Sequence, residues 1–261
     1  MKNFDELIQA GGKKAIRHYW KTRTGQLSPR RDGGKVRDQG RRAEVTGGKQ
    51  LDGFLWLIRD LLKEAGVKNA EVFTGQIDSY IPGFFRPTKR WDLLAIVDNN
   101  LLVCIEVKSQ AGPSYGNNFN NRIEEAIGNA HDFWRAYQEK AFTSSMKPFL
   151  GFLMLLEHDA ASTKAVKEKE PHFKVLPEFK NASYAKRYEI FCEKAQREGL
   201  YDATAFLMSN QRGGLKGEFI EPSDQLTLKT LAAEIYGKAV AYCKQREAAP
   251  SSRNREKVRD E

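Results

Sequence analysis

The chain has 261 residues, with 43 Lys and Arg against 34 Asp and Glu, which gives a formal net charge of +9. Hydrophobic residues make up 40% of it and aromatic residues 11%, so the composition excludes a wholly disordered chain. The length suits one large domain or two small ones.

Targeting and redox features point to one compartment. The sequence contains no apolar run of about 18 residues or more, which excludes a membrane-spanning helix, and its first residues lack the apolar core of a signal peptide. The three cysteines lie far apart, and their odd number does not favour a disulfide framework. We therefore expect a cytoplasmic protein.

The positive charge lies near the N-terminus. Between Lys13 and Lys49 there are twelve basic residues and three acidic ones, and the rest of the chain is balanced. A basic segment beside a neutral body is typical of a polyanion-binding protein, and this segment lacks the apolar face of a membrane-surface helix. We predict an N-terminal helix and basic arm over residues 1–48 that binds DNA, with a solvated loop as the alternative. The arm residues expected to contact phosphate are Arg30, Arg31, Arg41 and Arg42.

The predicted helices of the N-terminal part follow from apolar periodicity. Residues 4–23 have helical spacing, although the pair Gly11 and Gly12 argues against one continuous helix. The run from Leu51 to Leu62 repeats with a period of about 3.6 residues and is followed by Gly66, which predicts an amphipathic helix.

Short apolar runs predict the first strands. A strand is expected over residues 71–77, and two further strands over 91–97 and 101–107. The residues between the last two, Asp98, Asn99 and Asn100, are typical of a tight turn, so these two strands are predicted to form a β-hairpin.

Helices and strands alternate in the rest of the chain. Helices are expected over 124–140, 184–198 and 226–244, and strands over 149–156 and 204–208. This order predicts an α/β fold with a mixed sheet covered by helices on both faces. We assign residues 49–247 to this domain and residues 248–261 to a disordered tail.

The polar residues Asp92, Glu106 and Lys108 stand out in otherwise apolar strands. Side chains alternate along a strand, so Glu106 and Lys108 share a face, and the hairpin brings Asp92 opposite this position. Two carboxylates and an ammonium at one place suit Mg²⁺-dependent hydrolysis of a phosphodiester, with the lysine orienting or deprotonating the attacking water. The alternative is a strand end in which Lys108 only neutralises Glu106.

These residues resemble the motif of the PD-(D/E)xK nuclease superfamily, with Trp91 in place of its proline. Longer segments are similar to the XhoI family of type II restriction endonucleases, and the likeness runs from about residue 18 to 209. They are the stretches 82–94, 105–110, 112–122 and 170–173. The resemblance implies cleavage of double-stranded DNA at the palindrome CTCGAG, Mg²⁺ as the cofactor, a homodimer, and a partner methyltransferase in the host.

Further residues near the motif are candidates for DNA contacts. Lys89 and Arg90 precede Asp92, where they suit a phosphate beside the scissile bond or a solvated loop. The amide-rich segment after the hairpin is expected between strand and helix, where it reads bases or forms a turn and helix cap. Its candidate residues are Asn117, Asn118, Asn120, Asn121 and Arg122.

Three less central residues also receive an interpretation. Gln110 is on the same strand face as Lys108 and is a candidate for contact with the site. Glu124 and Glu125 open the predicted helix, where acidic side chains favour the helix dipole. We therefore interpret both glutamates as helix-capping residues rather than metal ligands.

The function favoured by the sequence is a Mg²⁺-dependent type II restriction endonuclease. One alternative is a repair or recombination nuclease of the same superfamily, which acts on DNA ends, flaps or junctions. The other is a non-catalytic nucleic-acid-binding protein in which Glu106 and Lys108 only pair.

Overall fold

The computed structural model describes residues 3–27, 49–67, 70–74, 78–143 and 146–248. The predicted arm residues Arg30, Arg31, Arg41 and Arg42 and residues 249–261 of the predicted tail lie outside this part of the chain, and Ala248 is the last residue of the final described helix. None of the described helices is long and apolar enough to cross a bilayer.

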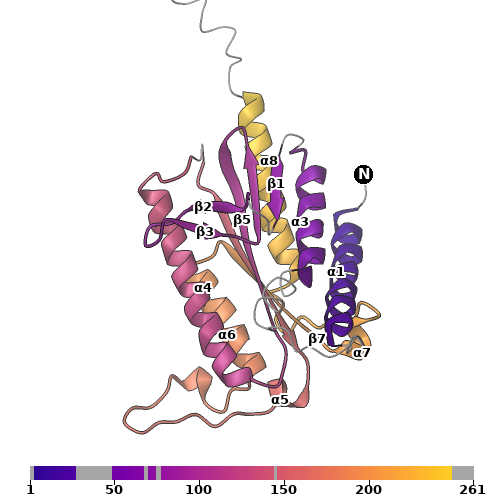
Figure 1. The fold of residues 1–261 in the computed structure, drawn as a ribbon, viewed down its shortest axis with the longest axis vertical. Coiled ribbons are helices and arrows are strands. Elements are labelled where there is room, and N and C mark those ends of the chain that lie inside the picture. Colours follow the sequence, from indigo (N-terminus) through magenta and orange to yellow (C-terminus); the bar gives the residue numbers. More distant parts are fainter. Residues whose placement is uncertain (1–2, 28–48, 68–69, 75–77, 144–145, 249–261) are drawn as a thin grey trace, which may run out of the picture.

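A five-stranded mixed sheet forms the centre of the protein (Figure 1). The strands β1 (Glu71–Thr74), β4 (Leu93–Val97) and β5 (Asn100–Gln110) are antiparallel, and β6 (Phe149–Glu157) and β7 (Ala203–Ser209) continue the sheet parallel to β5. The order is β1-β4-β5-β6-β7, so β5 is central and pairs with β4 on one side and β6 on the other.

The predicted hairpin is confirmed and its turn chemistry explains it. Val97 pairs with Asn100, so Asp98 and Asn99 form a two-residue turn. Both have positive φ, 49° and 61°, which is the left-handed conformation that a type I′ turn requires and that Asp and Asn tolerate. The register places Leu93 opposite Ile105, and therefore Asp92 beside Glu106.

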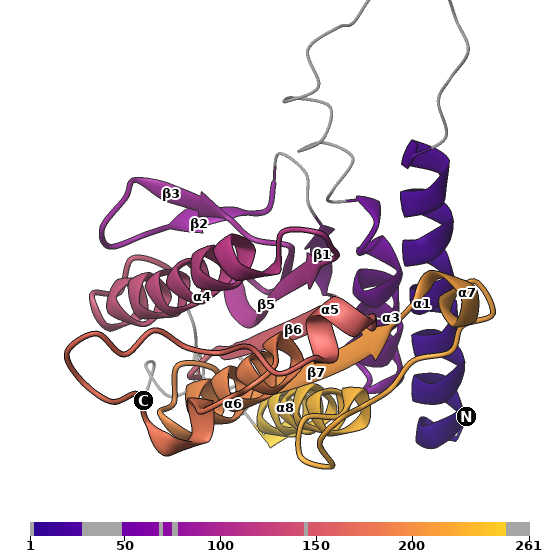
Figure 2. The same cartoon turned by 90° about the horizontal axis from the view of Figure 1, so that it is seen from below.

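Helices cover both faces of the sheet, as predicted (Figure 2). On one face, α1 (Phe4–Leu27), α3 (Asp52–Glu64) and α8 (Leu228–Ala248) pack on alternate side chains such as Leu93 and Ile105. On the other, α4 (Tyr115–Gln138) and α6 (Tyr184–Arg197) pack on Leu94 and Cys104. Short helices α5 (Ala160–Thr163) and α7 (Gln211–Gly214) follow β6 and β7, and a 3-10 turn, η1 (Pro177–Phe179), precedes α6.

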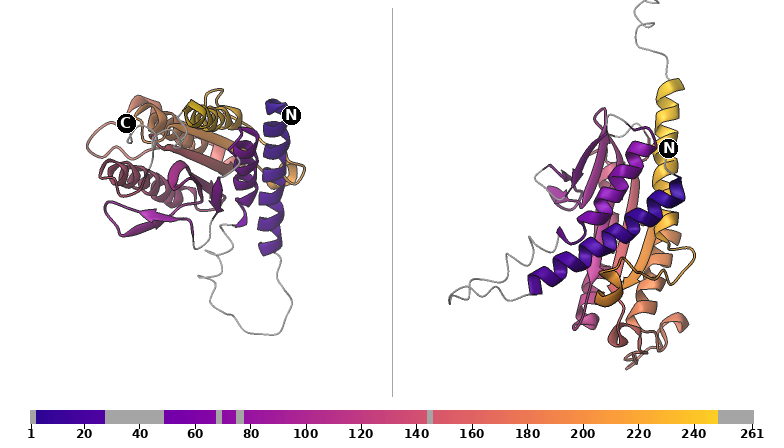
Figure 3. Two further views of the ribbon diagram at one scale, coloured as in Figure 1. Left: turned by 90° about the horizontal axis from the view of Figure 1, so that it is seen from above. Right: turned by 90° about the vertical axis from the view of Figure 1, so that its right-hand side faces the viewer.

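The helix predicted over residues 4–23 is confirmed, and α1 is continuous through Gly11 and Gly12, the pair that argued against one continuous helix. A Cβ atom at Gly11 would lie 2.3 Å from Leu57 Cδ1 of α3, and one at Gly12 would lie 2.8 Å from Leu228 Cδ2 of α8. Figure 3 shows α1 and α3 side by side. The glycines therefore permit close helix packing, which offsets their low helix propensity.

Two expectations need correction. Helix α4 starts at Tyr115 rather than at residue 124, so the amide-rich segment is its first two turns and not a linker. Glu124 and Glu125 consequently lie inside the helix and do not cap it. A second hairpin, β2 (Tyr80–Pro82) with β3 (Thr88–Arg90), was not predicted and lies beside α4 (Figures 1 and 2).

Candidate active site

Asp92 lies just before β4, where the hairpin register holds it against the catalytic strand. Its Oδ2 atom accepts a 2.8 Å hydrogen bond from the backbone N–H of Val107. Burial raises the pKa of Asp92, and the nearby Lys108 and this hydrogen bond act in the opposite direction. The carboxyl group is therefore fixed between the two strands, next to the predicted catalytic lysine.

Glu106 lies on β5, pointing towards α4 and α6, and only 1% of its surface is exposed. Both carboxylate oxygens are held. Oε1 accepts from Asn129 Nδ2 at 2.7 Å and lies 3.0 Å from Lys108 Nζ, and Oε2 accepts from the Tyr201 hydroxyl at 2.8 Å. A buried carboxylate needs such partners, because an unpaired charge in the interior is costly.

Lys108 bridges the strand and the helix. Its ammonium lies 3.0 Å from Glu106 Oε1 and 3.5 Å from Glu125 Oε2 on α4. Burial favours the neutral amine, but Glu106 and Asp92 outweigh it, so the pKa of Lys108 is raised. The lysine is thus a cation held among carboxylates.

Lys89 enters the same cluster from the β2–β3 hairpin. Its ammonium lies 3.8 Å from Glu106 Oε1 and 4.0 Å from the centre of the Trp91 ring. Burial lowers the pKa of Lys89, although Glu106 opposes the shift. Lys89 was expected to contact a phosphate next to the site, and the structure places it in the carboxylate cluster itself.

The other predicted DNA contacts in the described part of the chain lie on β3 and on α4. Arg90 is exposed on β3. On α4, Arg122 forms a 2.7 Å ion pair with Glu125, and its Nε atom is buried without a hydrogen-bond partner. Of the candidate asparagines on α4, Asn118 is half-buried. The exposed ones are Asn117, Asn120 and Asn121.

Gln110, a candidate for contact with the site, does not reach it. Its amide nitrogen donates to the backbone oxygens of Ser114 and Tyr115 at 3.4 and 3.0 Å, and its oxygen accepts from the Tyr188 hydroxyl. Gln110 therefore fixes the end of β5 to the start of α4 and to α6. This contact stabilises the fold around the amide-rich first turns of α4.

Sequence reasoning missed two residues of the cluster, Asn129 and Tyr201. Asn129 is 7% exposed on α4, and Tyr201 precedes β7 with no exposed surface. Burial raises the pKa of Tyr201 well above its ordinary value, and Glu106 adds to the shift, so the hydroxyl keeps its proton. A polar residue on the buried face of the helix 124–140 was the only signal in the sequence for Asn129.

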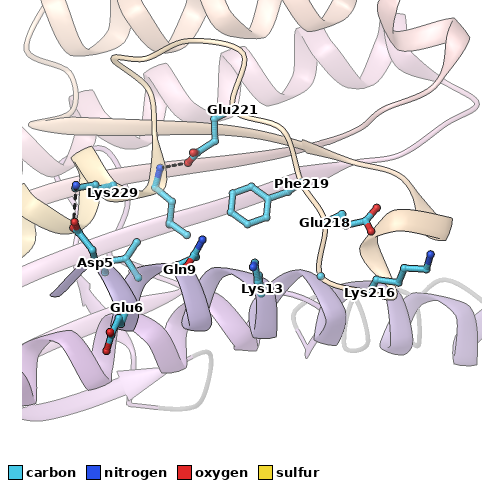
Figure 4. Close-up of a pocket in the computed structure, with 12 residues that line it drawn as sticks. Asp5, Glu6, Gln9, Lys13, Lys216, Glu218, Phe219, Glu221 and Lys229 are labelled. Carbon is cyan, nitrogen blue, oxygen red and sulfur yellow. Dashed lines mark hydrogen bonds and ion pairs between the residues drawn. The ribbon is translucent and has the colours of Figure 1, made fainter. Parts of the chain in front are cut away.

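A separate groove of about 790 Å³ lies between the N-terminal half of α1 and residues 216–221 (Figure 4). Its side chains carry both signs of charge, and Asp5 pairs with Lys229 at 2.9 Å. None of Asp92, Glu106 and Lys108 lines it. The catalytic candidates therefore lie outside this groove.

Comparisons with known proteins agree with one another. The family described as restriction endonuclease XhoI matches residues 30–221. The chain is 52% identical to the type II restriction enzyme BstVI of Geobacillus stearothermophilus over 197 residues, which cover 74% of this chain and 88% of that protein. It is 40% identical to the type II restriction enzyme XhoI of Xanthomonas vasicola over 201 residues, which cover 76% and 78%. No solved structure matches.

Proposed function

The chain belongs to the XhoI family of type II restriction endonucleases, and from this premise we propose that it cuts both strands of duplex DNA at CTCGAG with Mg²⁺ as its cofactor. The observation that carries the chemistry is the convergence of Asp92, Glu106 and Lys108 at one place on neighbouring strands. In this proposal the three side chains form the catalytic site.

The donor set fits Mg²⁺. Asp92 and Glu106 offer carboxylate oxygens, which are the hard ligands that this ion prefers. Among the described residues, no group of three or more His, Cys, Asp or Glu side chains is placed to hold a metal. An ion held by two carboxylates would complete its shell with water and phosphate oxygens, which is the usual arrangement for Mg²⁺ at phosphate-transfer sites.

Each residue of the site then has a defined task. Asp92 and Glu106 would hold the ion, which when bound supplies positive charge to the phosphate and activates water. Asn129 and Tyr201 fix the Glu106 carboxylate in its orientation. The Lys108 ammonium, 3.0 Å from Glu106, orients the attacking water and stabilises negative charge on the phosphate.

Binding of the duplex is assigned to residues around this cluster. Arg90 and the first two turns of α4 are accessible next to the catalytic strand, so the exposed asparagines can donate and accept hydrogen bonds with base edges. Arg122 and the arm residues Arg30, Arg31, Arg41 and Arg42 would contact phosphates. Lys89 would turn from Glu106 to a phosphate oxygen when DNA enters.

The symmetry of the target sets the proposed assembly. A palindrome has twofold symmetry, and one active site serves one strand at a time, so cleavage of both strands calls for a homodimer. A host that carries this activity also needs a methyltransferase that protects its own sites. Physical contact between the two enzymes is not required by this proposal.

Incubation with plasmid DNA and a gel tests the function. The wild-type protein should give discrete fragments with Mg²⁺ or Mn²⁺, cut within CTCGAG, and give none with excess EDTA. Asp92→Ala and Glu106→Ala should abolish cleavage, and a surface variant such as Asp60→Ala should not. Cutting in excess chelator, or a smear in place of fragments, would contradict the proposal.

A further inference from the structure

Two phenylalanines are exposed at the loop between β2 and β3. Phe84 is 42% exposed and Phe85 65% exposed, and they contact each other edge to face with ring centres 4.7 Å apart. Exposing large apolar side chains to water costs free energy. An exposed pair on a fixed backbone therefore indicates a binding surface.

The backbone of this loop is fixed by a buried carboxylate. Asp132 of α4 is 1% exposed, and its Oδ1 atom accepts hydrogen bonds from the backbone N–H groups of Phe84 and Phe85 at 2.8 and 2.7 Å. Its Oδ2 atom pairs with Arg86 Nε at 3.1 Å. The loop is therefore anchored to a helix by charge-assisted hydrogen bonds, which are stronger than neutral ones.

The loop also requires glycine at its start. A Cβ atom at Gly83 would lie 2.7 Å from Asp132 Oδ2 and 2.9 Å from the backbone oxygen of Arg86. The two rings are supported from α4, because Arg135 lies over Phe84 at 4.9 Å and His131 lies nearly parallel to Phe85 at 5.7 Å. The result is a preorganised pair of aromatic rings with little side-chain entropy left to lose on binding.

The position and charge of this loop indicate what it binds. Lys89, four residues after Phe85 on the same hairpin, lies 3.8 Å from Glu106 in the proposed active site. At about 3.3 Å per residue, the backbone from Lys89 to Phe85 spans at most about 13 Å, which is comparable with the ~12 Å major groove of DNA. Residues 80–90 include Arg86, Lys89 and Arg90 and no acidic residue, which favours a polyanion over an apolar protein partner.

We propose that Phe84 and Phe85 form an aromatic wedge that enters the base stack of the bound duplex beside the scissile phosphate. Phenylalanine wedges partly unstack a base step and kink the duplex, and flanking cations hold the phosphates. The wedge thereby makes binding depend on how easily the DNA deforms. This inference rests on the proposed function, because it assumes that duplex DNA lies on the Asp92, Glu106 and Lys108 site.

The test uses duplexes with CTCGAG in which 2-aminopurine replaces one adenine at a time, in and beside the site. Binding is measured with Ca²⁺ and cleavage with Mg²⁺. The wild-type protein should raise the fluorescence at one position or more. The variant Phe84→Ala/Phe85→Ala should lose this rise and bind about 5- to 150-fold more weakly, as expected for lost base stacking. Phe85→Trp, which keeps an aromatic ring at this position, should show both the fluorescence rise and the wild-type affinity.

Controls separate the wedge from other causes. Ile220→Ala removes a side chain of similar exposure, 47%, away from the hairpin and should leave fluorescence and affinity unchanged. Thermal unfolding should show that the double variant is folded.

Wild-type fluorescence that stays flat, or a double variant with wild-type affinity, overturns the wedge while the wild-type protein still cuts. If the only defect of the double variant is dissociation of a dimer, the two rings form a subunit contact, and this result also overturns the wedge. A wild-type protein that neither binds nor cuts DNA overturns the proposed function as well.

Discussion

Two buried carboxylates, Glu106 and Asp132, are each 1% exposed. Their partners differ: those of Glu106 suit a catalytic role, and those of Asp132 suit a structural one. Asp132 is satisfied by two backbone N–H groups and Arg86, all from one loop. Glu106 is satisfied by side chains from four separate parts of the chain, Lys89, Lys108, Asn129 and Tyr201, and it lies beside Asp92.

The difference lies in what the partners can do. Backbone donors within one loop fix a conformation, and they cannot be exchanged without unfolding that loop. Lysine ammonium groups are mobile cations on flexible stems, so they can turn from a carboxylate to a phosphate. The same burial therefore gives a structural anchor at Asp132 and an exchangeable, charged site at Glu106.

Helix α4 contributes a residue to each of two clusters, the one around Glu106 and the one formed by Asp132 with the β2–β3 loop. Asn129 and Asp132 are three residues apart, so they lie on the same side of the helix. Asn129 donates to Glu106, and Asp132 holds the β2–β3 loop. A movement of α4 would shift both the catalytic carboxylate and the aromatic rings, which links the proposed cleavage site and wedge mechanically.

The largest expected effect comes from a comparison of Lys108, the cation beside Glu106, with Arg86, the cation beside Asp132. Lys108→Ala should lower the cleavage rate about a thousandfold or more, because it removes stabilisation of the reacting phosphate and water. Arg86→Ala should lower it less than about tenfold, because Arg86 is 44% exposed and its ion-pair partner among the described residues is Asp132, the loop anchor. Single-turnover cleavage at saturating DNA measures both.

Binding with Ca²⁺ completes this experiment. The lysine variant should keep specific affinity for the duplex, because Lys108 reads no base. Equal losses of cleavage rate in the two variants would show that both clusters have the same role, and the contrast would fail.

A second prediction concerns the anchor. Asp132→Ala should destabilise the protein by about 3 kcal/mol, because it removes charge-assisted hydrogen bonds from a buried position. Hydrogen exchange should also show faster exchange at the amides of Phe84 and Phe85. Asp60→Ala, which removes an exposed carboxylate 3.9 Å from Arg59, should change stability by less than about 1 kcal/mol. Protected Phe84 and Phe85 amides in Asp132→Ala would show that the loop is held by other contacts.

The sequence predicted those parts of the site that depend on local pattern. The turn at Asp98 and Asn99 fixes the register, and strand alternation then places Asp92, Glu106 and Lys108 together. The order of helices and strands likewise predicted the covered mixed sheet, and its restriction-enzyme family was recognisable from the segments around the hairpin.

What the sequence did not predict depends on tertiary contacts. The start of α4 contains Gly116 and several asparagines, which have low helix propensity, yet Tyr115 is buried and Gln110 bonds to its backbone oxygen. Strands β2 and β3 have three residues each, too short for a periodic signal. Tyr201 reaches Glu106 across 95 residues, so no local pattern reports it.

The smallest expected effect tests whether Glu106 is oriented by its neighbours. Tyr201→Phe keeps the ring, whose centre lies 5.0 Å from that of Phe152, and removes only the hydroxyl that donates to Glu106. Loss of a group that orients a metal ligand costs about 10- to 100-fold in metal affinity or activity. The Mg²⁺ concentration for half-maximal cleavage should therefore rise about tenfold, and direct calorimetric titration with Mn²⁺ should show weaker binding. Tyr242→Phe is the matched control, because its hydroxyl lies 3.2 Å from Asp98 at the hairpin turn and contacts no catalytic residue. Both variants should lose about 1 kcal/mol of stability, and only Tyr201→Phe should change the metal dependence. An unchanged metal dependence in Tyr201→Phe would mean that Asn129 and Lys108 suffice to orient Glu106, and the hydroxyl would then be part of the fold alone.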